Sequence, residues 1–87
     1  MANYRLTMAT DDVSPAQSRA ARAYLEWGRR DLAGQAGVAE NTVYNFETGR
    51  VRNARPETRA KIRRAIEVAG LTFAGSDLIL PHAIIGG

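Results

Sequence analysis

The stretch from residue 29 to residue 48 constrains the fold most, because its apolar residues fit two short helices joined by a tight turn. The apolar side of the first helix consists of Leu32, Ala33 and Ala36. Gly37 follows where the chain must turn, and glycine adopts a positive φ at little cost. Val43 and Phe46 then give the second helix an apolar side that points back onto the first.

The other side of the second helix is polar and should face outward. It carries Glu40, Asn41, Tyr44 and Asn45. A row of carboxamides with an aromatic hydroxyl on a short exposed helix suits contact with base edges in the major groove of DNA, since Asn can pair bidentately with adenine. The segment is therefore predicted to be a helix-turn-helix.

Several groups of residues in and after this segment carry a family resemblance. They are Asp31-Leu32-Ala33, Ala36-Gly37-Val38, Thr42-Val43 and Phe46-Glu47-Thr48-Gly49-Arg50. Together they resemble the lambda-repressor-like (XRE) family of DNA-binding domains, more weakly over residues 14 to 70. The chain departs from the family at Ala39, where Ser or Thr usually caps the helix. Either the cap is looser here, or Asn41 or Thr42 replaces it.

The resemblance implies a transcription regulator, a repressor that binds a palindromic operator in double-stranded DNA as a homodimer. It implies that the base-reading residues are Glu40, Asn41, Tyr44 and Asn45, and that the backbone contacts are Arg29, Thr42, Arg50 and Arg52. For Glu40 two roles stay open, since it could accept from cytosine or simply favour the helix N-terminus.

The resemblance also implies an ion pair between Arg22 and Glu47. The alternative is that both side chains lie at the surface without contact. We favour the pair, because Arg22 falls on a mostly apolar helix face and a lone charge facing the core would be costly.

Two further helices should flank the central motif. Ser14, Pro15 and Gln17 form a capping box and predict a helix start, with the helix running to about residue 26. Pro56 predicts a fourth helix to about residue 69. Its core positions are Ile62, Ala65, Ile66 and Ala69, and its expected solvated face is Arg59, Lys61, Arg63 and Arg64, balanced by Glu57 and Glu67.

The segments outside residues 14 to 70 have no helical period. Residues 1 to 13 are predicted to be a flexible tail; a DNA-contacting arm through Arg5 is the alternative, which Asp11 and Asp12 disfavour. Residues 71 to 80 alternate and predict a β-hairpin that pairs Phe73 with Leu78, and a tail follows to residue 87. The excess of apolar residues in the hairpin and tail predicts a dimer contact through Phe73, Leu78, Ile79, Leu80, Ile84 and Ile85. The alternative is that the tail wraps back over its own helices and that the protein dimerises only on DNA. The fold class is thus mainly α: four helices with a C-terminal hairpin.

The composition of the chain restricts the classes of function that it can have. The chain has 87 residues and a net charge of +3, but residues 14 to 70 hold eleven of the twelve basic groups and six of the nine acidic ones. All but one of those eleven are arginine, which favours forked contacts with phosphate or guanine over diffuse attraction. The chain has one histidine, no cysteine and no residues with metal-ligand spacing. We therefore expect that it is not an enzyme and that it binds no metal or cofactor.

The absence of cysteine fits the reducing cytoplasm, and no apolar run approaches the length of a membrane span. A second function class stays open. The chain could be an antitoxin-like interaction module whose apolar C-terminal segment binds another protein, while DNA binding regulates its own operon.

Overall fold

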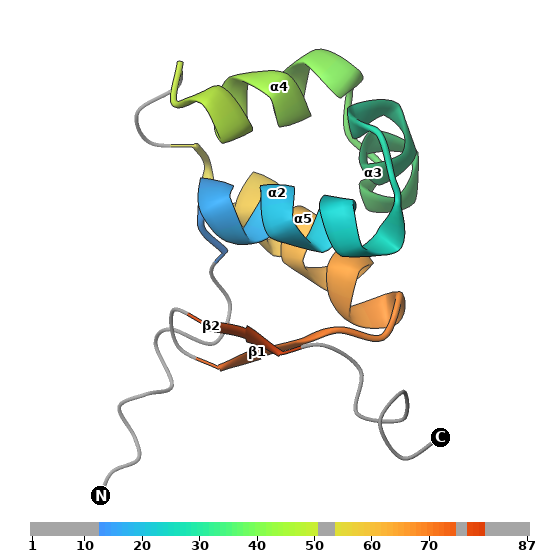
Figure 1. The fold of residues 1–87 in the computed structure, drawn as a ribbon. Coiled ribbons are helices and arrows are strands. Elements are labelled where there is room, and N and C mark those ends of the chain that lie inside the picture. Colours follow the sequence, from blue (N-terminus) through green and yellow to red (C-terminus); the bar gives the residue numbers. More distant parts are fainter. Residues whose placement is uncertain (1–12, 51–53, 75–76, 80–87) are drawn as a thin grey trace, which may run out of the picture.

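The computed structural model of the chain describes residues 13–50, 54–74 and 77–79. It is mainly helical, as the sequence predicts. The helices within these ranges are α2 (Pro15–Leu25), α3 (Arg29–Ala36), α4 (Glu40–Thr48) and α5 (Pro56–Val68). The strands are β1 (Thr72–Ala74) and β2 (Asp77–Ile79). In Figure 1, α4 lies at one end of the molecule, α2 and α5 lie in the middle and the two strands lie at the other end.

The helices begin where the local chemistry predicts. Ser14 Oγ accepts from the Gln17 amide at 3.0 Å, and Gln17 Oε1 accepts from the Ser14 amide at 2.9 Å. This capping box is confirmed, with Pro15 at the first helical position, where no amide bond is needed. Pro56 likewise occupies the first helical position of α5, although the N-cap residue Arg55 makes no side-chain cap bond.

The core lies between the helices and includes both apolar faces of the central motif. Its buried members are Val13, Ala21, Leu32, Ala33, Val43, Phe46, Ile62, Ala65, Ile66, Leu71 and Phe73. Val43 and Phe46 therefore pack inward as predicted. The predicted tail boundary is wrong at Val13, because this side chain is only 3% exposed and belongs to the core. Residues 1–12 lie outside the described residues.

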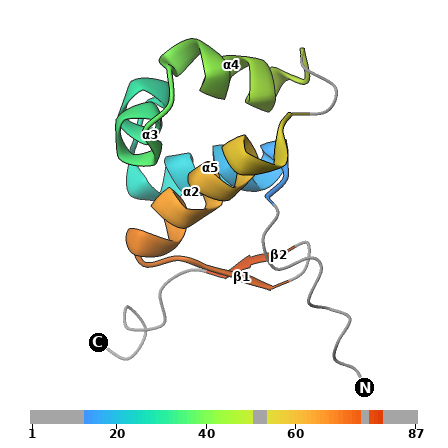
Figure 2. The same ribbon diagram turned by 180° about the vertical axis from the view of Figure 1, so that it is seen from behind.

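The two strands pair antiparallel, with Phe73 opposite Leu78, which is the predicted register. The connecting residues 75–76 lie outside the described residues, so the hairpin as a whole stays a prediction. β1 packs against α5 and β2 against α2. Figures 1 and 2 show from both sides that the sheet and α4 lie on opposite sides of α2 and α5.

The sheet changes the role of two residues. Arg63, predicted on a solvated face, is only 8% exposed, because β1 covers this side of α5. Its guanidinium lies 4.4 Å from the centre of the Phe73 ring, and its Nε lies 2.8 Å from Glu67 Oε2. Phe73 is thus a core residue, 8% exposed, which leaves it little surface for the predicted dimer contact.

The other predicted dimer residues are placed less fully. Leu78 and Ile79 lie in β2, whereas Leu80, Ile84 and Ile85 lie outside the described residues. No helix in the described ranges is both long enough and apolar enough to cross a membrane.

Candidate nucleic-acid interface

The turn between α3 and α4 is built by Gly37, whose φ of 75° is the left-handed value predicted for this position. Its amide donates to Ala33 O at 2.9 Å, and the Val38 amide donates to the same carbonyl at 3.1 Å. These bonds close α3, and the chain then enters α4 from Ala39. No side chain caps α4, so neither Asn41 nor Thr42 replaces the missing cap.

The two sides of α4 differ as the sequence predicts. Val43, Phe46 and Glu47 are buried, whereas Glu40 and Asn41 are exposed. Tyr44 and Asn45 are half-buried. The polar residues of α4 therefore lie on its accessible side, at the end of the bundle away from the sheet (Figure 1).

The buried side of α4 is fixed to α2 by the predicted ion pair. Arg22 Nη2 lies 2.7 Å from Glu47 Oε1, and Arg22 Nε donates to Glu47 Oε2 at 3.0 Å. The Glu47 side chain is 2% exposed and that of Arg22 is 18% exposed. The bond to Glu47 raises the pKa of Arg22 above its usual value, although burial partly opposes this effect. A raised pKa means that folding favours the charged guanidinium, and this contribution to stability is lost as the pH rises through that pKa.

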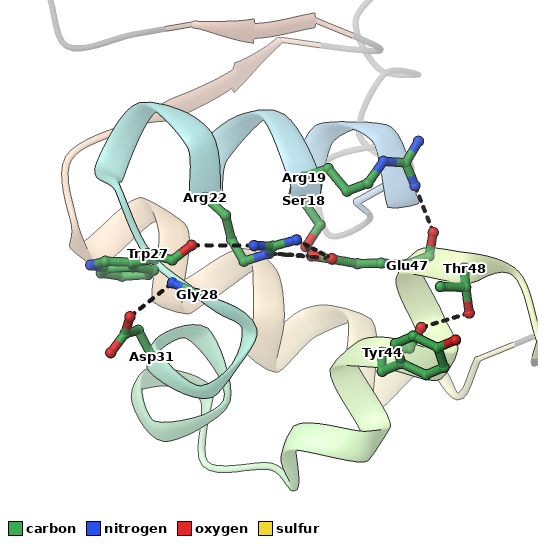
Figure 3. A network of polar contacts seen from close by, with 9 residues as sticks. All are labelled: Ser18, Arg19, Arg22, Trp27, Gly28, Asp31, Tyr44, Glu47 and Thr48. Carbon is green, nitrogen blue, oxygen red and sulfur yellow. Dashed lines mark hydrogen bonds and ion pairs between the residues drawn. The ribbon is translucent and has the colours of Figure 1, made fainter.

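Two neighbours of Arg22 extend this contact. Figure 3 shows Ser18, Arg19 and Arg22 reaching from α2 toward Glu47. Ser18 Oγ donates to Glu47 Oε2 at 2.5 Å, and Arg19 Nη1 donates to the Glu47 carbonyl at 2.6 Å. Ser18 and Arg19 were not predicted from the sequence as partners of Glu47. The available signal was helical spacing, which places positions 18, 19 and 22 on neighbouring parts of one helix surface.

The accessible side of α4 meets the first turn of α3. The guanidinium of Arg29 lies 4.9 Å from the centre of the Tyr44 ring, and Arg30 Nε lies 3.6 Å from Glu40 Oε1. A shallow hollow of about 480 Å³ lies at this junction and is lined by Arg29, Glu40, Asn41 and Tyr44. The structure thus brings Arg29 together with three of the four base-reading candidates.

Asn45, the fourth candidate, lies elsewhere on α4. It lines a second hollow of about 310 Å³, between α4 and the start of α5, together with Thr42, Phe46, Ala54, Arg55 and Thr58. Arg55 therefore lies near Asn45 and is a further candidate for phosphate contact. Arg50 is exposed directly after the end of α4, and Arg52 lies outside the described residues.

Arginines flank α4 on both of its ends. Arg29 and Arg30 stand at the start of α3 beside the N-terminal half of α4, Arg50 follows its C-terminus and Arg55 precedes α5. This arrangement suits a polyanion that runs past both ends of the helix. Within the described part of the chain, no group of His, Cys, Asp or Glu residues could hold a metal ion.

Comparison with known proteins adds no further assignment. The resemblance to lambda-repressor-like domains therefore depends on the motif residues alone. Neither a protein-family model nor a curated protein matches this chain.

Proposed function

We propose that the chain is a sequence-specific DNA-binding transcription regulator, a repressor that binds a palindromic operator as a homodimer. The observation that carries this proposal is the division of α4 into two sides. One side is buried on the bundle, and the other presents Glu40, Asn41, Tyr44 and Asn45 beside a tight turn from α3.

In the proposed complex α4 lies in the major groove. A helix of 9 residues is about 13 Å long, and the groove is about 12 Å wide, so α4 fits with its polar side toward the base edges. Asn41 and Asn45 supply donor and acceptor pairs for adenine. Arg29, Thr42, Arg50 and Arg52 contact the phosphates on either side.

The position of the sheet limits how two copies can pair. The sheet lies on the far side of the bundle from α4 (Figure 2). Two copies joined through the outer faces of their sheets would point their α4 helices in opposite directions, away from a common DNA. Antiparallel pairing along a strand edge, about an axis normal to the sheet, keeps both α4 helices on the same side. We therefore place the homodimer contact along a strand edge and the residues that follow β2.

Selection of bound sequences from random double-stranded DNA tests the function. The proposal expects enrichment of an inverted repeat whose half-sites are about one helical turn apart. A pool that shows no enrichment would overturn it. If the purified protein also binds a partner protein stoichiometrically through its C-terminal segment, the interaction-module alternative is correct, because that alternative combines DNA binding with neutralisation of a partner.

The dimer needs a separate test that spares the fold. Truncation after Gly70 is unsuitable, because it removes Leu71 and Phe73 from the core. Truncation after Ile79 keeps both strands and removes Leu80, Ile84 and Ile85. We expect light scattering to give the mass of a monomer for the truncated protein. We also expect this protein to bind a full operator no better than a half operator. A shortened protein that remains dimeric and keeps full-operator affinity would exclude the residues after β2 from the contact.

A further inference from the structure

Two arginines at the start of α3 contact two of the base-reading candidates on α4. The Arg29 guanidinium lies over the Tyr44 ring at 4.9 Å from its centre. Arg30 Nε lies 3.6 Å from Glu40 Oε1, in a pair whose side chains are 87% and 50% exposed. Both contacts cross from one helix of the motif to the other.

We infer that Arg29 and Arg30 are positioning residues for the reading surface. Arg29 fixes the ring of Tyr44, and Arg30 compensates the charge of Glu40. The inference rests on the proposed function and deepens it, since the sequence analysis assigned Arg29 to the DNA backbone and gave Arg30 no role.

Arg30 acts through Glu40 because of where this carboxylate stands. Glu40 is the first residue of α4, so a DNA duplex docked on α4 would bring phosphates toward it. An uncompensated carboxylate would repel them. In free protein an exposed ion pair contributes little to folding, because water screens it. Bound DNA displaces water and adds negative charge, and compensation of Glu40 then has its main effect on DNA affinity.

Arg29 acts on Tyr44 through the shape of its guanidinium. A planar cation over an aromatic ring is favoured by the ring's quadrupole and restricts the orientation of both side chains. The Tyr44 hydroxyl would then have its direction before DNA arrives, which lowers the entropy lost on binding. Lysine keeps the positive charge of arginine but lacks the flat surface, so Arg29→Lys separates stacking from charge.

A double-mutant cycle tests Arg30 on the selected operator. Affinity is measured over a series of salt concentrations for the unchanged protein, Arg30→Gln, Glu40→Gln and the double variant. We expect Arg30→Gln to weaken binding about fivefold when Glu40 is present and less than about twofold in the Glu40→Gln background, with an unchanged salt slope. Arg64→Gln on α5 is the matched control for loss of one charge, because the hollow that Arg64 lines contains no α4 residue.

Two results would contradict the positioning role of Arg30. An equal loss in both backgrounds with a salt slope lower by about one would show that Arg30 contacts a phosphate itself. No loss in either background would also overturn the inference. The urea midpoint of Arg30→Gln should stay close to that of the unchanged protein, which separates an effect on binding from an effect on folding.

A second cycle with Arg29→Lys and Tyr44→Leu tests the stack. We expect Arg29→Lys to cost about threefold in affinity when Tyr44 is present and almost nothing in the Tyr44→Leu background. In the free protein, the Arg29 side-chain protons should show an upfield ring-current shift in NMR spectra that disappears in Tyr44→Leu. Absence of that shift, or an equal cost of Arg29→Lys in both backgrounds, would overturn the inference for Arg29.

These outcomes distinguish the inference from the proposed function. If the unchanged protein selects an operator but neither cycle shows coupling, the positioning role is wrong and DNA binding stands. If the unchanged protein selects no sequence, the proposed function itself fails.

Discussion

The charged groups that contact the C-terminal half of α4 are buried, whereas those that contact its N-terminal half are exposed. Glu47 is almost fully buried and bonds to Ser18 and Arg22 of α2 at 2.5 to 3.2 Å. Glu40 and Tyr44, at the other half, meet two arginines of α3 at longer distances and with much of the Glu40 side chain exposed. The buried contacts fix where α4 sits on the bundle. The exposed contacts orient polar side chains of α4 and leave them accessible.

This difference predicts that substitutions at the two halves of α4 affect different properties, namely the stability of the fold and the recognition of DNA. Removing one partner of a buried pair leaves a charge without compensation in a place that water reaches poorly. Removing an exposed contact leaves groups that water can solvate. Changes near Glu47 should therefore alter the free energy of unfolding, and changes near Glu40, Asn41 and Asn45 should alter DNA binding.

The largest expected effect is that of Glu47→Ala on stability. It strands Arg22 and leaves the Ser18 hydroxyl without its acceptor, which should lower the free energy of unfolding by about 3 kcal/mol. Glu40→Ala is the matched control, since it removes a carboxylate from the same helix and should cost no more than about 0.5 kcal/mol. Urea midpoints measured by circular dichroism compare the two. Equal midpoints would show that burial of Glu47 is not what fixes α4.

The next effect concerns recognition by the accessible side. Asn45→Ala and Asn41→Ala should each weaken binding to the selected operator by about 2 kcal/mol, because each would remove the proposed bidentate contact to a base. Binding to unrelated DNA should stay the same, and so should the urea midpoint. Fluorescence anisotropy with operator and scrambled duplexes measures the difference. An equal loss on both duplexes would place these residues on the backbone instead of the bases.

Arg50→Ala should weaken DNA binding less than the Asn variants do, and without a preference for the operator. Arg50 follows the end of α4 and is exposed, so it suits a phosphate contact. Its removal should weaken binding to all duplexes alike by about 1 kcal/mol and should reduce the slope of log affinity against log salt by about one. A loss confined to the operator would instead give Arg50 a role in sequence recognition.

The same division explains what the sequence could predict. Apolar spacing and helix-start chemistry placed all four helices, because a buried face and a cap leave regular local patterns. The Arg22–Glu47 pair was predicted through the family resemblance. The burial of Arg63 was not, since it depends on β1 covering α5, a contact between segments whose relative placement the local pattern does not specify. The contacts of Arg29 and Arg30 were missed for a related reason: long side chains on a surface have many possible partners.

The smallest expected effect concerns the start of α4, which has no side-chain cap. Ala39 has φ −74° and ψ 150°, the extended conformation of an N-cap residue, but its methyl group cannot accept a hydrogen bond. Ala39→Ser supplies an oxygen for a free amide of the first turn and should stabilise the protein by about 0.5 to 1 kcal/mol. Ala60→Ser, at an exposed position inside α5, is the control and should be neutral or slightly destabilising. If both variants unfold at the same urea concentration, the first turn of α4 is already satisfied by water, and the family's usual Ser or Thr at this position would serve DNA contact more than helix stability.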